Sequence, residues 1–273
     1  MSNTQLRIIS GLFLISIVLG CLLMGPNACL FFIGLIGVFV IDEIIVNFYD
    51  QYRYSKRYIF SQVLYLTGFS FFNFYQISDS SFHFWNSAGV FLNILFLSYL
   101  FLVFKKSETL IKVFKATSWL TGLIILIPLI SLGSVIHFKN WQMFLIGLLI
   151  LNFMVDTAAY FTGKKFGKHK LWESVSPKKT IEGALGGVFF SVLATSFFWK
   201  KYVSDVTPFT IVFFTFVACS SQVGDLVQSK LKRQFEIKDS SSLIPGHGGV
   251  YDRVDSLLFV APFYAFYLMA NFQ

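Results

Sequence analysis

The segment from Ser229 to Asp255 contains the residues most capable of chemistry. It holds five basic residues, four acidic residues, a histidine and a Gly-Gly pair. The whole chain is 55% hydrophobic and only 13% charged, so solubility does not explain such a cluster. Carboxylates mixed with cations are typical of sites that bind a hard metal ion together with phosphate. We therefore expect this segment to face a polar ligand at the edge of an apolar body.

A carboxylate precedes this segment at the end of an apolar run. Helical spacing relates four polar residues, Ser221, Asp225, Ser229 and Lys232. No helix breaker follows them until Pro245. A continuing helix would therefore present Asp225 on one face between two hydroxyls, with a cation beyond. A charge that merely lies among the lipid headgroups at a helix end is the alternative interpretation.

The segment Pro245-Gly246-His247-Gly248-Gly249 interrupts the helical pattern. Proline lacks a backbone donor and glycine favours left-handed backbone, so we expect a turn whose N–H groups bind an anion such as phosphate. His247 is interpreted as a hydrogen-bonding residue on phosphate, with a metal ligand or general acid as alternatives. Asp252 and Asp255 follow on one face of the next helix, beside Arg253. Helix capping is the alternative role for either acid.

A second hydrophilic loop, from Thr162 to Thr180, holds six lysines and interspersed glycines. Its lysines also match the positive-inside pattern of membrane proteins, which needs no ligand. The end of the loop, Ser176-Pro177-Lys178-Lys179-Thr180, predicts a Ser N-cap with Pro at N1. The free N–H groups of that helix and its two lysines would meet a phosphate. The P-loop order GxxxxGK[ST] is missing, which disfavours a Walker-type ATPase.

Three further carboxylates lie within apolar runs, where a charge is costly. Asp156 is followed one turn later by Tyr160, near the basic loop, and is assigned to the site. Asp42 and Glu43 have no neighbouring motif. For these two we expect an interhelical hydrogen bond or a headgroup contact, and we place them outside the site.

Membrane helices must position these residues, because the mean hydropathy is +0.67 and the chain contains 35 Phe. Crossing about 30 Å of hydrocarbon takes about 20 residues, and the segments that fulfil this are Ile8 to Met24, Ala28 to Val46, Ile59 to Gln76, Phe84 to Phe104, Thr117 to Ile136, Trp141 to Phe161, Gly183 to Trp199, Thr207 to Gly224 and Val254 to Phe272. None shows the period-2 alternation of a barrel. We therefore predict an all-α polytopic integral membrane protein with about nine transmembrane helices. It forms a single membrane domain over 1–273, with few motifs in 1–140 and the catalytic helices and loops in 141–273.

The distribution of basic residues predicts the orientation in the membrane. With nine spans, every Lys and Arg except Lys139, Lys200 and Lys201 falls on the side of the N-terminus. The positive-inside rule then gives a cytoplasmic N-terminus and active site and a C-terminus outside. A net charge of +8 without a basic stripe on a soluble domain favours anionic lipid headgroups and nucleotides over nucleic acid as partners. The three cysteines show no metal-binding spacing.

These motifs resemble the phosphatidate cytidylyltransferase, or CDP-diacylglycerol synthase, family. The family's C-terminal signature is a serine, one spacer, an aliphatic residue, Lys-Arg, four spacers, Lys-Asp, and then His-Gly-Gly ending in Asp-Arg-x-Asp. Ser229 to Asp255 matches it throughout. The segments Asp156-Thr157-Ala158-Ala159-Tyr160 and Ser176 to Gly183 also resemble family motifs. The resemblance is strong over Asn152 to Ser256, whereas the first 150 residues are similar only in hydropathy.

The resemblance implies transfer of a cytidylyl group from CTP to phosphatidate, giving CDP-diacylglycerol and pyrophosphate in phospholipid biosynthesis. Phosphatidate carries its own anionic nucleophile, so the protein would mainly bring two polyanions together and stabilise charge. The implied cofactor is Mg²⁺, and a second, monovalent cation and a homodimer are left open. The implied location is the bacterial inner membrane.

The resemblance also assigns roles to residues. The catalytic set is Asp225, Asp252, Asp255, Lys232, Arg233 and His247. The set that binds the substrates is Ser176, Lys178, Lys179, Thr180, Ser229, Gly248, Gly249 and Arg253. The metal set is Asp225, Asp252, Asp239 and Asp156.

Two other functions remain as alternatives. A related CTP-dependent transferase acting on another lipid would share the metal and phosphate site. An ion-coupled transporter would use Asp42, Glu43 and Asp156 as intramembrane acids. Transporters usually bind their substrates near the membrane midplane on broken helices, whereas the acids here gather at one face beside basic loops.

The metal role of Asp252 gives a direct prediction. Asp252→Asn is expected to abolish CTP-dependent formation of CDP-diacylglycerol and to leave membrane insertion intact, because the amide loses the charge that a metal needs. Radiolabelled CTP incorporated into lipid measures the effect, and full activity of the variant would contradict the metal role. Asp42→Asn serves as the control and is expected to be far milder.

Overall fold

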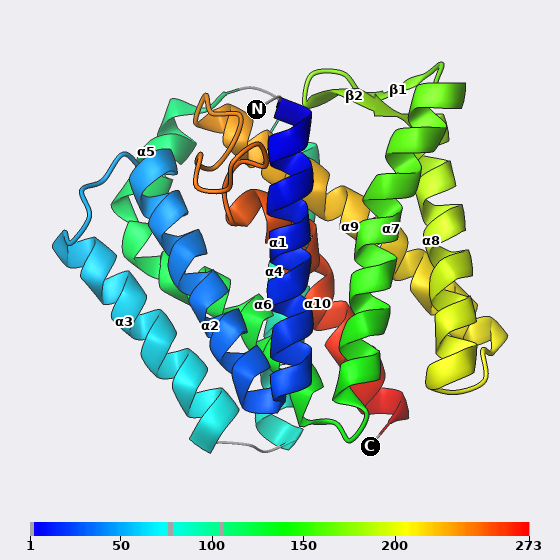
Figure 1. The fold of residues 1–273 in the computed structure, drawn as a ribbon. Coiled ribbons are helices and arrows are strands. Elements are labelled where there is room, and N and C mark those ends of the chain that lie inside the picture. Colours follow the sequence, from blue (N-terminus) through cyan, green and yellow to red (C-terminus); the bar gives the residue numbers. More distant parts are fainter. Residues whose placement is uncertain (1–2, 76–78, 104–105, 273) are drawn as a thin grey trace.

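The computed structural model describes residues 3–75, 79–103 and 106–272, which form a bundle of helices with one small hairpin (Figure 1). The helices are α1 (Asn3–Met24), α2 (Pro26–Glu43), α3 (Lys56–Ser70), α4 (Asp79–Leu102), α5 (Glu108–Ala116), α6 (Thr121–Ser134), α7 (Trp141–Phe166), α8 (Ile181–Tyr202), α9 (Pro208–Gln234) and α10 (Tyr251–Asn271). Short π or 3-10 turns are η1 (Ile44–Phe48), η2 (Phe71–Tyr75), η3 (Ser118–Leu120) and η4 (Val135–His137). The strands β1 (Lys170–Trp172) and β2 (Ser176–Thr180) pair antiparallel between α7 and α8.

Membrane-spanning length and composition are found in eight helices of the described part of the chain. These are α1, α2 with η1, α4, α6 with its flanking turns, α7, α8, α9 and α10. The chain is therefore an all-α polytopic membrane protein, as predicted. The predicted span from Ile59 to Gln76 corresponds to α3 and η2, and α3 by itself has only 15 residues. Gln76 and Phe104, two predicted span ends, lie outside the described residues, and the number nine stays a prediction.

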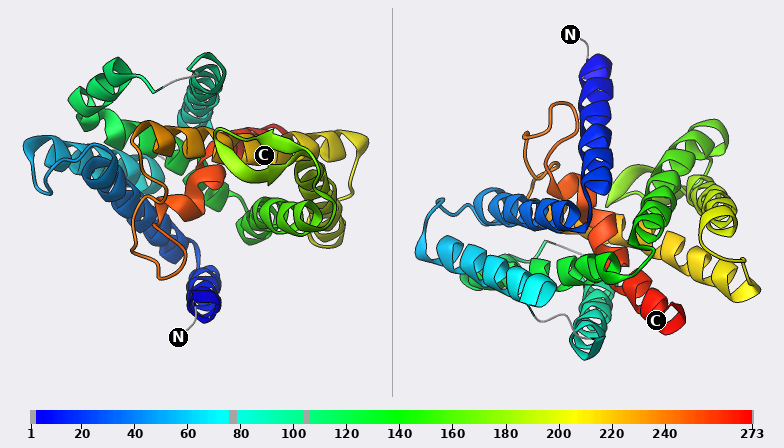
Figure 2. Two further views of the ribbon diagram at one scale, coloured as in Figure 1. Left: turned by 90° about the horizontal axis from the view of Figure 1, so that it is seen from above. Right: turned by 60° about the horizontal axis from the view of Figure 1, so that its bottom comes forward.

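The segments that the sequence singled out gather at one end of the bundle. Figure 1 shows the N-terminus, the β1–β2 hairpin and the segment between α9 and α10 at the same end, and the C-terminus at the opposite end. Figure 2 shows α1 at the periphery of the bundle. The motifs of both hydrophilic loops thus lie at the same end of the bundle.

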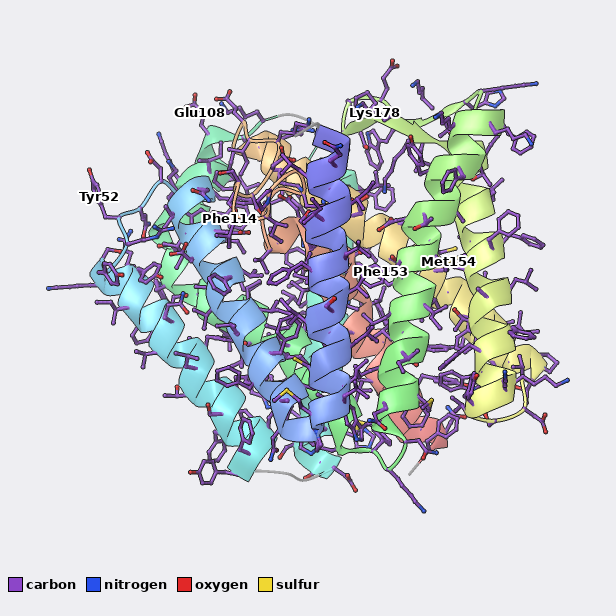
Figure 3. The ribbon with its side chains drawn as sticks, viewed as in Figure 1. Tyr52, Glu108, Phe114, Phe153, Met154 and Lys178 are labelled. Atoms are coloured by element: carbon purple, nitrogen blue, oxygen red, sulfur yellow. The ribbon has the colours of Figure 1, made fainter. Side chains whose placement is uncertain are left out.

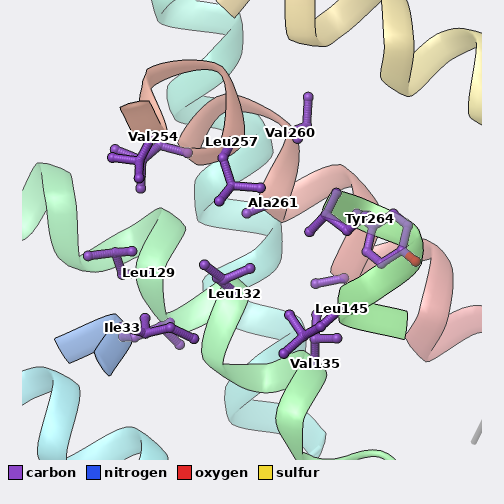
Figure 4. Close-up of a cluster of buried hydrophobic side chains, with 14 of the residues drawn as sticks. Ile33, Leu129, Leu132, Val135, Leu145, Val254, Leu257, Val260, Ala261 and Tyr264 are labelled. Atoms are coloured by element: carbon purple, nitrogen blue, oxygen red, sulfur yellow. The ribbon is translucent and has the colours of Figure 1, made fainter. Parts of the chain in front are cut away.

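The C-terminal helix α10 lies at the centre of the bundle and packs against α9, α6 and α4. Figure 4 shows apolar side chains of α10, including Leu257 and Ala261, facing Leu129 and Leu132 of α6. Close approach at glycine tightens this packing, because a Cβ atom at Gly89 would lie 2.5 Å from the Pro262 ring. Most residues of this helix are buried, which gives the start of the helix, with Asp252 and Asp255, a defined position.

Helices α7 and α8 pack against each other along small residues. A Cβ atom at Gly187 would lie 2.7 Å from the carbonyl oxygen of Val155, and one at Gly183 would lie 2.8 Å from that of Ala159. Small residues let membrane helices approach closely, where van der Waals contact between backbones stabilises the pair. This seam positions the β1–β2 hairpin, which connects the two helices.

The seam predicts a specific cost for adding one methyl group. Gly187→Ala is expected to destabilise the protein by about 1–3 kcal/mol, the usual cost of overpacking, because the obstructing atoms belong to the α7 backbone. Gly20→Ala is the matched control, since no atom lies within 4 Å of a Cβ there. The thermal midpoint of unfolding in detergent measures both variants, and equal midpoints would contradict the importance of the seam.

Candidate functional site

Lys232 and the two acids of α10 form a buried ion-pair cluster. The Lys232 Nζ donates to Asp252 Oδ1 at 2.7 Å and lies 3.7 Å from Asp255 Oδ2. The three side chains are 9%, 5% and 10% exposed, respectively. Because α9 runs without a break to Gln234, it brings Lys232 to the first turn of α10. The predicted continuation of this helix and the shared face of the two acids are both confirmed.

A second ion pair joins the hairpin to α9. Lys179 on β2 pairs with Asp225, and the Ser229 hydroxyl donates to Asp225 Oδ1 at 3.3 Å. Asp156 on α7 interacts electrostatically with Asp225, Lys179 and Arg253. The structure therefore brings acids and cations from the hairpin, α7, α9 and α10 into one group.

A cavity of about 320 Å³ opens beside this second pair. Its wall includes Asp156, Tyr160, Gly163, Lys164, Lys178, Lys179, Thr180 and Gln222. Its volume falls in the range of small-molecule sites. Figure 3 shows Lys178 on the hairpin, at the end of the bundle where Glu108 also lies. A larger cavity of about 710 Å³, lined by Phe82, His137 and Phe272, lies away from both ion pairs, so volume alone does not identify the site.

The helix start predicted at Ser176 is wrong. Ser176–Thr180 is strand β2, and Thr180 is the N-cap of α8, its Oγ1 accepting from the Gly183 N–H at 3.1 Å. The strand tolerates Pro177 because a two-stranded hairpin leaves one edge of each strand without ladder hydrogen bonds. Lys170 Nζ donates to the Pro177 carbonyl at 2.7 Å and stabilises the hairpin. Lys178 and Lys179 consequently reach the site from a strand, not from the first turn of a helix.

The glycine turn exists, and its last amide, that of Gly249, faces a carboxylate. Gly246 and Gly248 have φ of 74° and 84°, in the left-handed region that glycine favours. The Gly249 N–H donates to Asp252 Oδ2 at 2.9 Å. Anions therefore do lie beside this turn, but they are the protein's own, and a contact with phosphate stays a prediction.

His247 lies against α1. Its Nδ1 is 2.7 Å from the Ser10 hydroxyl, and Arg7 Nε donates to the Gly246 carbonyl at 2.8 Å. Burial, with Arg253 and Arg7 nearby, lowers the pKa of His247 below its usual value. The imidazole is consequently neutral near pH 7. No motif in α1 pointed to the site, so this contact was missed.

Three other predicted residues, Arg233, Asp239 and Arg253, lie at the surface of the protein. Arg233 is exposed and donates to the Ile237 carbonyl at 2.9 Å, which stabilises the turn after α9. Asp239 and Arg253 are also exposed, and Asp239 lies close to Gly248. Whether these residues contact a substrate stays a prediction.

The acids supply oxygen donors of the type that Mg²⁺ prefers. Within the ranges that the structure describes, however, no three His, Cys, Asp or Glu side chains come close enough to hold a metal ion. Lys179 and Lys232 lie beside the carboxylates and neutralise them. In this arrangement the protein's own ammonium groups balance the charge of the acids, and a bound Mg²⁺ stays a prediction.

Glu43, which we placed outside the site from the sequence, makes the interhelical hydrogen bond expected of it. Its side chain is buried and accepts from the hydroxyls of Ser240 and Ser241 and from the N–H groups of Val250 and Tyr251. The cost of burying an acid in an apolar run was the only signal in the sequence.

The neighbouring Asp42 makes the interhelical bond that was expected. It accepts from the Tyr58 hydroxyl of α3 at 3.0 Å and pairs with Arg53 at 2.9 Å.

A buried hydrogen-bond chain below the acids was also missed. Ser221 donates to Asn152 Oδ1 at 2.8 Å, and Asn152 Nδ2 donates to the Ser256 hydroxyl at 3.1 Å. The chain links α9, α7 and α10 and leaves these buried polar groups satisfied.

Comparison with known proteins agrees with this geometry. The model of the cytidylyltransferase family matches residues 5–271, so the chain belongs to that family. Phosphatidate cytidylyltransferase of Bacillus subtilis (strain 168) is 45% identical over 119 residues, which are 43% of this chain and 44% of the relative. The proteins of the same name from Staphylococcus aureus (strain COL) and Staphylococcus epidermidis (strain ATCC 12228) are 45% and 42% identical over 118 and 114 residues, 41% of this chain and 44% of each relative. Each match thus spans less than half of the relative's length.

The buried cluster predicts unequal roles for two lysine ion pairs. Lys232→Ala is expected to destabilise the protein by about 3–5 kcal/mol, because Asp252 and Asp255 lose the cation that compensates their buried charge. Lys106→Ala is the control, since Lys106 and Glu236 are 47% and 73% exposed and such pairs contribute about 0–1 kcal/mol. Thermal unfolding in detergent compares the variants, and equal losses would contradict the structural role of Lys232.

Proposed function

We propose that this protein transfers the cytidylyl group of CTP to phosphatidate, forming CDP-diacylglycerol and pyrophosphate. The observation that carries the proposal is the gathering of ion-paired lysines and acids from both hydrophilic loops and α9 at one end of a membrane bundle. The family and the names of the relatives point to the same reaction. The site would lie on the cytoplasmic face of a bacterial inner membrane, where a nucleotide and a lipid headgroup can meet.

The reaction requires charge to be balanced more than it requires a base. A phosphate oxygen of phosphatidate would attack the α-phosphorus of CTP, and the bond from that phosphorus to the bridging oxygen of pyrophosphate would break. Lys179 and Lys232, now paired with carboxylates, could instead contact phosphate oxygens. Ammonium groups placed in this way stabilise the charge that spreads over the transferring phosphoryl group.

Mg²⁺, when bound, would neutralise the triphosphate and be held by Asp225 and Asp252. Asp255, Asp156 and Asp239 would act as supporting acids. The cavity beside Lys178 and Lys179 is large enough to take a phosphate group, and its wall reaches the exposed ring of Tyr160 on α7. An apolar wall next to a basic one suits a ligand with an acyl chain and an anionic head.

The proposal is tested with purified protein in detergent, α-labelled CTP, phosphatidate and Mg²⁺. We expect label in the lipid fraction and release of pyrophosphate only when the protein, CTP, phosphatidate and Mg²⁺ are all present. Replacement of phosphatidate by a polyprenyl phosphate tests for a related transferase acting on another lipid. Product from the second acceptor alone would overturn the proposed substrate, and absence of CTP consumption would overturn the reaction.

Lys179 gives a further prediction within this reaction. Lys179→Met is expected to lower kcat/KM by about 10- to 100-fold, because a hydrogen bond to a charged group contributes about 1.5–3 kcal/mol. Lys139→Met is the control, since Lys139 lines the distant cavity. Steady-state kinetics with CTP measures both, and a value for Lys179→Met equal to that of the control would contradict the assignment.

A further inference from the structure

Glu43 caps the first turn of α10 from another helix. The N-cap residue of α10 is Val250, and its side chain makes no capping hydrogen bond. Instead Glu43 Oε1 accepts from the Val250 N–H at 2.8 Å, and Oε2 accepts from the Tyr251 N–H at 2.9 Å. A carboxylate at a helix N-terminus satisfies free N–H groups and interacts favourably with the helix dipole. Glu43 therefore holds the turn that carries Asp252.

The same carboxylate holds the segment before α10. Glu43 Oε2 accepts from the Ser240 hydroxyl and Oε1 from the Ser241 hydroxyl, both at 2.7 Å. Four residues after Glu43, within the π turn η1, Asn47 Nδ2 donates to the Ser240 carbonyl at 2.6 Å. The end of α2 and η1 thus bind Ser240 at two points, and π turns are frequent at functional sites.

Ser240 connects Glu43 to the acid of the ion-pair cluster. The Ser240 N–H donates to Asp252 Oδ2 at 2.7 Å, and its hydroxyl lies 3.0 Å from the same oxygen. The other oxygen, Oδ1, accepts from Lys232. Contacts therefore run without interruption from Glu43 through Ser240 and Asp252 to Lys232.

One hydroxyl hydrogen cannot be donated to two carboxylates at once. The Ser240 hydroxyl lies between Glu43 at 2.7 Å and Asp252 at 3.0 Å, so its orientation depends on both acids. Gly249 lies against this group, where any side chain would collide with Ser240 and Glu43. Dense packing of this kind leaves Asp252 few alternative orientations.

We propose that Glu43 is a positioning residue that orients Asp252 and Lys232 for cytidylyl transfer, an inference that rests on the proposed function. A carboxylate is suited to this position because its oxygens accept all four donors. A glutamine of the same shape would turn an NH₂ group toward two of those donors. Partners that orient a site residue typically contribute 10- to 100-fold to activity or metal affinity, so roughly that loss is expected in kcat.

The test combines kinetics with hydrogen exchange on the full chain in detergent. Glu43→Gln is expected to lower kcat by about 10- to 100-fold, to leave KM for CTP within about twofold and to speed amide exchange of the peptide that contains Val250 and Tyr251. Asp42→Asn is the matched control, because Asp42 is the neighbouring residue and pairs with Arg53 instead. It is expected to leave kcat, KM for CTP and the amide exchange of this peptide unchanged. A higher KM for CTP with an unchanged kcat would overturn the positioning role.

A double-mutant cycle separates positioning through Ser240 from a general loss of stability. If Glu43 acts through Ser240, Glu43→Gln and Ser240→Ala together should lower kcat little more than the more damaging single change. If the fold-loss of kcat in the double variant equals the product of the two single losses, the two residues act independently and the proposal is overturned. Asn47→Ala replaces Glu43→Gln if the latter does not insert, with a loss of kcat again expected. An inactive wild-type protein overturns the proposed function, whereas an active wild type with an equally active Glu43→Gln overturns only the role of Glu43.

Discussion

An ammonium group buried between two carboxylates constrains the rest of this structure. Lys232 can reach Asp252 and Asp255 only if α9 continues past the apolar core and α10 begins directly beside it. Removal of three charged groups from water is costly and is offset only by close mutual contact and hydrogen bonds. The separation of α9 and α10 at this end of the bundle is therefore tightly limited.

The position of α10 explains why helices without motifs matter to the site. Helices α4 and α6 pack against α10 along its apolar length, while α2 supplies Glu43 to its first turn. Arg7 and Ser10 of α1 likewise bond the segment from Pro245 to His247. The N-terminal half is thus the support on which the acids of the C-terminal half are oriented.

The local features of the site were readable from the sequence. Helical spacing placed Lys232 on the same face of the helix as Asp225. The Gly-rich turn before Asp252 followed from the backbone conformations that proline and glycine allow. Hydropathy predicted the spans well enough to bring both hydrophilic loops to one end. All of these depend on neighbours in the chain, so a single sequence contains the necessary information.

Long-range partners were not readable, and Glu43 and Ser176 show why. Glu43 is separated from Tyr251 by 208 positions, and no local pattern encodes which distant amides a buried acid will meet. At Ser176 the local capping signal competed with pairing to β1, and Thr180, four residues later, could cap the same helix. In each case packing between segments decided the outcome. The charges of the site are consequently balanced by contacts that the motifs alone do not define, because Lys179 and Lys232 neutralise the acids from two different elements.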